Sequence, residues 1–168
     1  MIVSLIVAIS NNRAIGKDNQ LIWQLPKDMK FFMDSTTSHP VIMGRKNYES
    51  IPEKYRPLRN RTNIIITRNK SFEANGCLVV NSIEESLRCM NFRDTEEIFV
   101  IGGGEIYKKF LDLNLIDRMY ITHIDEFFEG DTFFPKIELS EWKEVKIDKR
   151  KKDENHNYDF TFIRYDKI

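Results

Sequence analysis

The sequence predicts an α/β fold: a central, mostly parallel, twisted β-sheet with antiparallel C-terminal strands, flanked by about four helices. Residues 2–9 form a nearly continuous apolar run rich in β-branched residues, which suits a strand buried on both faces of a parallel sheet. Further short apolar runs alternate with helix signals between residues 26 and 107. Residues 142–145 and 158–165 alternate as an antiparallel pair should.

Length and composition favour one domain over residues 1–168, with 41% hydrophobic and 31% charged residues. Lys+Arg and Asp+Glu both number 26, so an overall attraction to nucleic acid or to an acidic membrane is unsupported. No apolar run approaches the ~18 residues that span a bilayer. The two cysteines and three histidines lack metal-ligand spacing. We expect a cytoplasmic monomer with no metal, no membrane contact and no nucleic-acid partner.

Residues 11–20 are rich in Asn, Gly and Asp, which predicts a loop. A lid or binding loop and a plain connector are both open readings of it. A helix then begins at Pro26, whose missing N–H is harmless in a first turn. Asp28 lies in that turn, on the helix flank that also carries Phe32. It either favours the helix N-terminus electrostatically or is a desolvated acid that faces a ligand.

Two basic sites follow short strands. A buried strand at residues 40–43 ends at Gly44, where a helix start with Arg45 and Lys46 would form a weakly specified phosphate site. The polar connection 51–61 leads to a strand at 63–67, and Arg68 follows that strand at the binding edge of a parallel sheet.

A glycine-rich junction is the next strong signal. After a strand at 77–80, Ser82 and Glu85 form a capping box for a helix that we expect to run to about Met90. A strand at 97–101 is followed by three glycines, 102–104, and a helix. This is not the dinucleotide fingerprint G-x-G-x-x-G, but it can expose N–H groups to a pyrophosphate.

The C-terminal third reads as strands and turns. Residues 118–124 are strand-like, and residues 129–135 form a turn that carries aromatic side chains. The charge run 148–155 interleaves acids with bases, so we interpret it as a solvated hairpin tip rather than a nucleic-acid patch.

Taken together, the sequence resembles the dihydrofolate reductase family along its whole length. Six ordered blocks carry the resemblance: Ile15-Gly16 with Asn19, Leu21 and Trp23; Leu25-Pro26 to Asp28; Pro40 to Arg45; Arg56-Pro57-Leu58 with Arg61; Ile101 to Tyr107; and Glu129 to Thr132 with Phe134-Pro135.

The resemblance implies reduction of 7,8-dihydrofolate to tetrahydrofolate by NADPH, with a hydride passing to pterin C6 and a proton reaching N5. This reaction would support one-carbon metabolism and thymidylate synthesis, and antifolates would bind the same site. Asp28 would bind the pterin and support its protonation through water, with Leu21 and Trp23 completing the catalytic set. Two alternatives are a pyrimidine reductase of riboflavin synthesis and a catalytically silent folate- or nucleotide-binding module.

The same resemblance assigns the binding residues. Substrate contacts fall to Ile6, Val7, Ala8, Asp28, Met29, Phe32, Ile51, Leu58, Arg61, Ile101, Tyr107 and Thr122. Cofactor contacts fall to Ala8, Ile15, Gly16, Asn19, Gln20, Gly44, Arg45, Lys46, Asn47, Ile66, Thr67, Arg68, Gly102, Gly103, Gly104, Glu105, Ile106 and Tyr107. Within these sets Arg61 would hold the glutamate α-carboxylate, and Thr67 with Arg68 the 2′-phosphate. The peptide bond between Gly102 and Gly103 would be cis.

Three places depart from the family pattern. Ile22 replaces a proline, residues 52–55 look like an insertion, and Arg59-Asn60 stands where Pro-Gly is frequent. Ile22 removes a φ constraint from the lid loop, so we expect altered loop closure or product release rather than altered chemistry.

Overall fold

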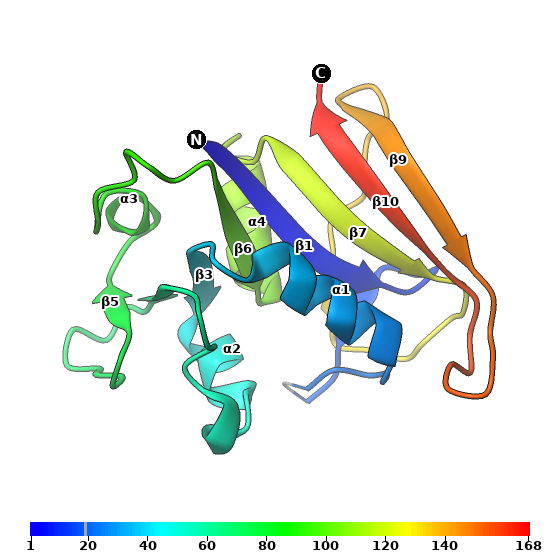
Figure 1. Cartoon of the computed structure of the whole chain (residues 1–168), viewed down its shortest axis with the longest axis horizontal. Helices are drawn as coiled ribbons and strands as arrows, with labels where there is room; N and C mark the ends of the chain where they lie inside the picture. The colour runs from blue at the N-terminus through cyan, green and yellow to red at the C-terminus, as the bar shows by residue number, and fades with distance from the viewer. Residues whose placement is uncertain (19) are drawn as a thin grey trace.

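An eight-stranded sheet in the order β5-β4-β3-β6-β1-β7-β10-β9 organises the computed structural model, which describes residues 1–18 and 20–168 (Figure 1). The strands of this sheet are β1 (Ile2–Ile9), β3 (Val41–Gly44), β4 (Asn63–Ile66), β5 (Leu78–Val80), β6 (Glu97–Gly102), β7 (Arg118–Ile124), β9 (Trp142–Arg150) and β10 (Phe160–Lys167). A two-stranded sheet joins β2 (Ala14–Gly16) to β8 (Thr132–Phe133). The helices are α1 (Pro26–Thr36), α2 (Arg45–Ser50), α3 (Ile83–Ser86) and α4 (Gly104–Asp112), with a 3₁₀ turn at Glu53–Tyr55.

The first strand lies in the middle of the sheet, as its apolar sequence predicts. β1 pairs in parallel with β6 on one side and β7 on the other. Leu5 is fully buried between them. β10 pairs antiparallel with both β7 and β9. The predicted mixed α/β sheet with an antiparallel C-terminal end is therefore confirmed.

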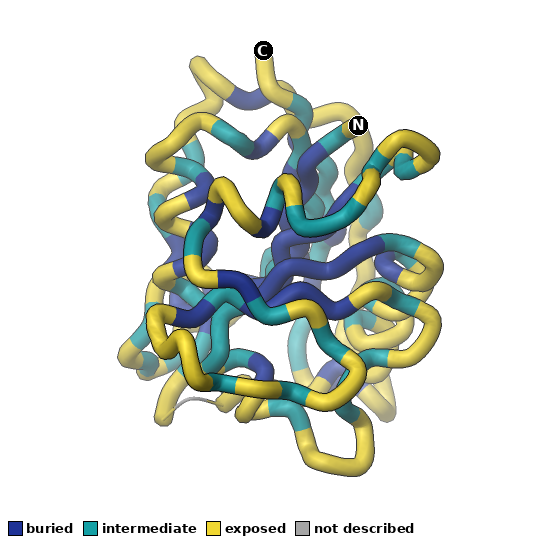
Figure 2. Tube along the Cα trace, turned by 90° about the vertical axis from the view of Figure 1, so that its left-hand side faces the viewer, coloured by how far each residue is buried: buried dark blue, intermediate teal, exposed yellow. Residues whose placement is uncertain are grey.

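Helices cover both faces of the sheet, with α1 on one and α4 on the other (Figure 1). Because successive side chains of a strand point to opposite faces, Leu5 packs with Phe110 of α4, whereas Ile6 packs with Phe32 of α1. Buried segments run through the middle of the molecule and exposed loops surround them (Figure 2). The face that carries α1 also carries Asp28.

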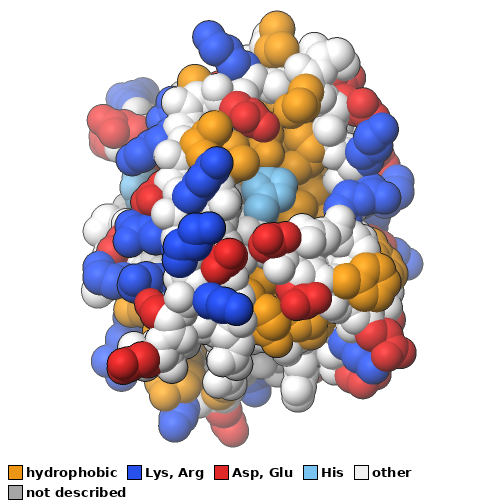
Figure 3. All heavy atoms as spheres, turned by 90° about the vertical axis from the view of Figure 1, so that its right-hand side faces the viewer, with side chains coloured by type: hydrophobic (Ala, Val, Ile, Leu, Met, Phe, Trp, Pro, Cys, Tyr) orange, Lys and Arg blue, Asp and Glu red, His pale blue; other side chains and the backbone are white. Residues whose placement is uncertain are grey.

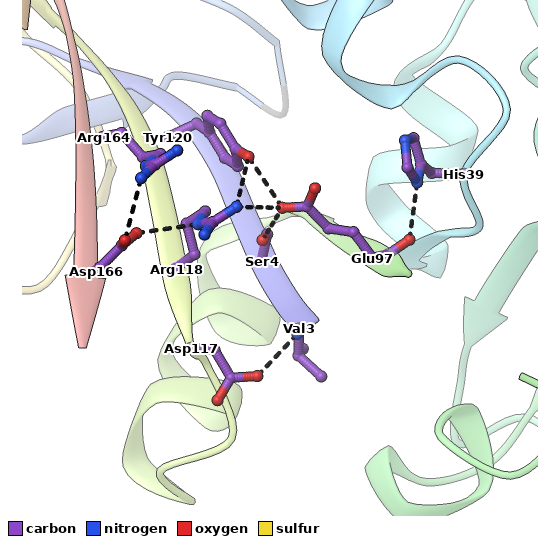
Figure 4. A network of polar contacts seen from close by, with 9 residues as sticks. All are labelled: Val3, Ser4, His39, Glu97, Asp117, Arg118, Tyr120, Arg164 and Asp166. Carbon is purple, nitrogen blue, oxygen red and sulfur yellow. Dashed lines mark hydrogen bonds and ion pairs between the residues drawn. The ribbon is translucent and has the colours of Figure 1, made fainter. Parts of the chain in front are cut away.

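A polar network ties the strands together at the amino ends of the parallel strands (Figure 4). The Glu97 carboxylate accepts hydrogen bonds from the hydroxyls of Ser4 and Tyr120. Arg118 lies 3.7 Å from Glu97 and pairs with Asp166 at 2.9 Å. These contacts join β1, β6, β7 and β10, and they leave the opposite, carboxyl ends of the parallel strands for a site.

Three sequence predictions about element boundaries are wrong. Residues 14–16, predicted as loop, form a strand because they pair with Thr132–Phe133, which local composition does not reveal. The helix after Ser82 ends at Ser86 rather than near Met90, because the N–H groups of Leu87 and Arg88 bond carbonyls only three residues back.

The third correction concerns the C-terminal hairpin. β9 runs to Arg150 and β10 begins at Phe160, so residues 148–150 of the predicted tip belong to a strand. β9 is the last strand of the sheet, where charged residues are tolerated because most side chains face water.

The surface mixes charges of both signs. On the face at the right of Figure 1, basic and acidic side chains lie interspersed (Figure 3). This agrees with the formal net charge of zero. Across residues 1–18 and 20–168, no helix is long and apolar enough to cross a membrane.

Candidate active site

Asp28 is joined to the sheet by a hydrogen bond across the α1 face. Thr122, buried on β7, donates its hydroxyl proton to Asp28 Oδ1 at 2.6 Å. Burial raises the pKa of Asp28 above its ordinary value, while the bond from Thr122 stabilises the ionised form and opposes that rise. This desolvation agrees with the second reading of Asp28, and the ligand that it would face stays a prediction.

Apolar side chains predicted to line the substrate site gather on the same face. Phe32, Ile51 and Leu58 pack against the cluster that contains buried Ile6 and Ile101. Ala8 packs beside the neighbouring cluster of Trp23 and Leu25. These residues come from β1, α1, β6 and the segment after α2, so only the fold brings them together.

Three predicted residues stand apart from this group. The side chain of Val7 packs on the opposite, α4 face, because it alternates with Ile6 and Ala8 along β1. Met29 and Leu21 are exposed, whereas Trp23 is buried and its ring lies 5.3 Å from that of Phe128. Trp23 is therefore a packed anchor for the segment that leads into α1.

Tyr107 reaches the site from the other side of the sheet. Its hydroxyl donates to the Ile6 carbonyl at 2.7 Å. Burial raises the pKa of Tyr107, and the charge of Asp28 raises it further. The phenol therefore stays protonated and acts as a donor to the Ile6 carbonyl on β1.

Arg61 lies at the far end of α1. Its Nη1 donates to Thr36 Oγ1 at 3.0 Å, and its Nε donates to the Arg59 carbonyl at 2.8 Å. Burial lowers the pKa of its guanidinium. Eight residues separate Asp28 from Thr36, which is about 12 Å along a helix. The site therefore offers an acid and a guanidinium at the two ends of one elongated face.

The three glycines differ in what surrounds them. Gly102 has φ +112°, and a Cβ there would meet the Tyr107 ring at 3.0 Å. A Cβ on Gly104 would meet Thr132 Cγ2 at 2.5 Å. A Cβ on Gly103 would meet no atom within 4 Å in the part of the chain that the structure describes, its two chain neighbours aside. The Gly102–Gly103 peptide is cis, as the family resemblance implies.

The predicted lid segment lies against these glycines. Ile15 on β2 is buried, and its Cδ1 would be 3.5 Å from a Cβ on Gly104. Gly16 follows it and pairs with Thr132 of β8. Gln20 exchanges two backbone hydrogen bonds with Lys17, each 3.0 Å long. Asn19 lies outside the described residues.

The start of α2 lies beside the glycine junction. A Cβ on Gly44 would meet the Ile106 side chain at 3.0 Å, and Asn47 donates to the Ile101 carbonyl at 3.3 Å. Arg45 pairs with Glu49 at 2.9 Å, and Lys46 is exposed on the same helix. The fold thus places two of the predicted cofactor blocks side by side.

The last predicted cofactor residues flank the first turn of α4. Exposed Arg68 pairs with Glu105 at 2.9 Å. Lys109 and Arg68 hold the pKa of Glu105 below its usual range. Thr67 is buried and accepts a bond from the Asn69 N–H at 3.1 Å, whereas Ile66 packs into the core.

Sequence reasoning missed three residues that shape the site. Phe31 stacks on Phe162 with ring centroids 4.4 Å apart, Thr36 orients Arg61, and His156 bonds the backbone of Lys27. For Phe31, the one local signal in the sequence was an aromatic residue three positions after Asp28, on the same side of the predicted helix. The other two depend on contacts between distant segments.

Comparison with known proteins gives consistent relatives. A dihydrofolate reductase of Haemophilus influenzae is 46% identical over 97% of this chain and 97% of that protein. One from Staphylococcus haemolyticus is 43% identical over 99% of this chain and 96% of that protein. The solved structure of an Enterococcus faecalis dihydrofolate reductase, complexed with NADP(H) and RAB-propyl, superposes with a TM-score of 0.86 at 37% identity, covering 99% of this chain and 96% of that one.

The family model for dihydrofolate reductase matches residues 2–167, which include α1 with Asp28, the glycine junction and the C-terminal hairpin. This match includes all six ordered sequence blocks, and the similarity to the solved structure covers the architecture that surrounds them. The chain therefore belongs to the dihydrofolate reductase family.

Proposed function

We propose that Asp28 is the acid function in the NADPH-dependent reduction of 7,8-dihydrofolate to 5,6,7,8-tetrahydrofolate, the reaction of the chain's family. The observation that carries this role is the hydrogen bond between partly buried Asp28 and buried Thr122, with oxygens 2.6 Å apart. Burial raises the pKa of this carboxyl group, so its protonated form persists to a higher pH than that of an exposed aspartic acid. Such a group can bind the pterin amino group and ring nitrogen and favour protonation at N5 through water.

Thr122 and Tyr107 assist Asp28 in different ways. The Thr122 hydroxyl fixes one oxygen of the carboxylate, so the other oxygen is directed to a ligand. Tyr107 adds a protonated phenol beside the Ile6 carbonyl. A group that stays neutral and polar stabilises charge that develops in a water-poor site.

Arg61 binds the glutamate end of the substrate in this proposal. A planar guanidinium suits bidentate recognition of a carboxylate. Its Nε and Nη1 are already oriented by the Arg59 carbonyl and Thr36, so the side chain is held in place before a ligand arrives. The span of ~12 Å along α1 suits a substrate with a pterin at one end and a carboxylate at the other.

The glycine junction fits the phosphates of NADPH. Contact with Tyr107 accounts for Gly102, and contact with Thr132 accounts for Gly104. Among the described residues, apart from the two chain neighbours of Gly103, no atom lies within 4 Å of the position that a Gly103 side chain would take. This open position, at the start of the nine-residue helix α4, leaves room for a pyrophosphate to approach backbone N–H groups. Arg68 and Thr67 would hold the 2′-phosphate. The bound cofactor supplies the hydride that reaches pterin C6.

The same proposal includes a single domain, a cytoplasmic location and a monomeric enzyme. One sheet takes strands from Ile2 to Lys167, which supports a single domain over residues 1–168. We place the enzyme in the cytoplasm, since Cys77 and Cys89 are free thiols as in a reducing compartment. It acts as a monomer on dihydrofolate, and antifolates bind the same face.

The test measures the loss of NADPH absorbance after purified protein is mixed with NADPH and dihydrofolate. The native chain and Asp28→Asn are assayed in parallel. We expect turnover by the native chain and a loss of about 10²–10⁴-fold in the variant at neutral pH, the range of a lost acid–base group. The variant should recover partly at low pH, where dihydrofolate itself is protonated. Equal rates for both proteins would remove Asp28 from the mechanism.

A further inference from the structure

The first turn of α1 is held by a residue from the other end of the sequence. Leu25, at the N-cap position, provides no side-chain hydrogen bond, and Pro26 has no N–H to satisfy. The N–H of Lys27 donates instead to Nε2 of His156 at 3.1 Å. Lys27 directly precedes Asp28, and its partner lies on the connection between β9 and β10 (Figure 1). The amino end of the catalytic helix is thus capped from the C-terminal hairpin.

His156 is itself tightly held. It is only 2% exposed, its Nδ1 lies 2.8 Å from Asp153 Oδ1, and its ring lies 5.2 Å from that of Phe160. A backbone N–H can only donate, so Nε2 must be the acceptor. Nδ1 therefore carries the ring proton and donates a hydrogen bond to Asp153. Lys27 Nζ lies 3.6 Å from the other oxygen of Asp153. The imidazole therefore has one tautomer and one orientation.

The same hairpin strand also reaches the other groups that place Asp28. Phe162 of β10 stacks on Phe31, which follows Asp28 by three residues on α1. Phe162 is also the register partner of Thr122, the residue that bonds the Asp28 carboxylate. The connection before β10 therefore contacts α1 just before Asp28, and β10 itself contacts α1 one turn after Asp28. β10 also pairs with β7, the strand that carries Thr122.

We propose that His156 is a positioning residue for Asp28: by accepting from the Lys27 N–H, it fixes the first turn of α1 so that the carboxyl group faces the pterin. The inference rests on the proposed role of Asp28. It assigns a kinetic function to a hairpin residue that touches neither substrate nor cofactor. A merely stabilising cap would contribute to folding without affecting the chemical step.

Substitutions at His156 separate the two hydrogen bonds of its ring. His156→Gln can place an oxygen near the position of Nε2 and keeps an acceptor for Lys27. His156→Asn can replace only the Nδ1 donor to Asp153. His156→Ala removes both. Single-turnover hydride transfer, steady-state KM values and the pH profile of the rate are measured for each full-length variant.

We expect His156→Ala and His156→Asn to lower the hydride-transfer rate about tenfold, within the ~100-fold that a 1 Å misplacement can cause. The apparent pKa of the rate should fall toward that of an ordinary carboxyl, because a loosened first turn admits water to Asp28. The KM for NADPH should not change. His156→Gln should restore both the rate and the pH profile.

Asp117→Ala is the matched control. Asp117 also accepts from a distant backbone N–H, that of Val3 at 2.9 Å, but at the opposite end of the sheet. This variant should lose thermal stability and keep the native rate and pH profile.

The outcomes distinguish the two proposals. A native chain that does not oxidise NADPH with dihydrofolate would overturn the reaction itself. An active native chain with unchanged rate and pH profile in His156→Asn would overturn the positioning role alone. Should His156→Ala fail to fold, the pair of Gln and Asn variants still decides: equal rates for the two contradict the proposal, and a slower Asn variant supports it.

Discussion

Two opposing effects at Asp28 set its proton affinity, and each can be traced to a contact. Burial disfavours the ionised carboxylate, whereas the Thr122 hydroxyl favours it. Sequence patterns at this position allowed both a helix-capping acid and a catalytic one. The family resemblance favoured the catalytic reading. The contact that opposes the effect of burial comes from Thr122, which lies 94 residues away in the chain and gives no local signal of that contact.

Removing the Thr122 hydroxyl should shift the balance toward the protonated acid. Thr122→Val keeps the shape of the side chain but deletes the donor, so the pKa of Asp28 should rise further. The apparent pKa of the rate, measured by NADPH absorbance across a pH series, should rise with it. Thr122→Ser keeps the donor and should retain the native profile. Superimposed profiles for all three proteins would show that the hydroxyl does not tune Asp28.

At the scale of elements, the strongest predictions came from sequence patterns whose physical cause lies within the same stretch of sequence. The apolar run of β1 needs burial on both faces, and the strand–glycine–helix pattern around residues 97–112 is realised by β6 and α4. The short pair of β2 and β8 has no such signal, because its strands are three and two residues long and meet only in the folded chain. The end of α3 was missed because its last N–H groups bond carbonyls only three residues back, and the extension of β9 because it depends on pairing with β10.

The glycine junction offers a paired test at this scale. Gly104→Ala would place a methyl 2.5 Å from Thr132 Cγ2 and force β8 away from α4. We expect a loss of about 1–3 kcal/mol in the free energy of unfolding, as for overpacked sites. Urea unfolding measures it, and adding Thr132→Ser, which removes Cγ2, should recover most of it.

Gly103→Ala should behave in the opposite way. Apart from its chain neighbours, its new methyl group meets no atom of the described residues within 4 Å, and φ is −77°, so the folded protein should keep its stability. The methyl would occupy the space assigned to the pyrophosphate, and the KM for NADPH should rise about tenfold, equivalent to ~1.4 kcal/mol. A destabilised Gly103→Ala with an unchanged KM would contradict the assignment of this space to the cofactor.

For the whole molecule, the site lies at one end of the parallel strands and a polar network lies at the other. Glu97, Arg118 and Asp166, together with Ser4, join four strands at that end. Asp28, in contrast, is partly buried, with a hydroxyl partner and no cation in direct contact among the described residues. The end that carries Asp28 therefore holds an ionisable group whose charged form opposes folding, so the free energy of unfolding depends on pH.

The sign of that dependence follows from the raised pKa of Asp28. At pH values above its folded-state pKa, the acid is ionised in both states, but only the folded chain bears the desolvation penalty. As the pH falls, the folded chain binds the proton first, so this contribution to stability improves. The improvement is complete once the unfolded chain is also protonated, below its ordinary pKa of 3.8.

Asp28→Asn should therefore be more stable than the native chain at neutral pH, although it is less active. The Asn carbonyl can still accept from Thr122, so the substitution removes the charge and keeps the contact. The difference should be about 1.4 kcal/mol for each unit by which burial raises the pKa, and it should shrink as the pH falls toward the ordinary value. Urea unfolding of both proteins across a pH series measures it, because titration of all other groups cancels in the subtraction. A variant that is less stable at neutral pH would mean that the ionised Asp28 is stabilised by its surroundings rather than opposed by them.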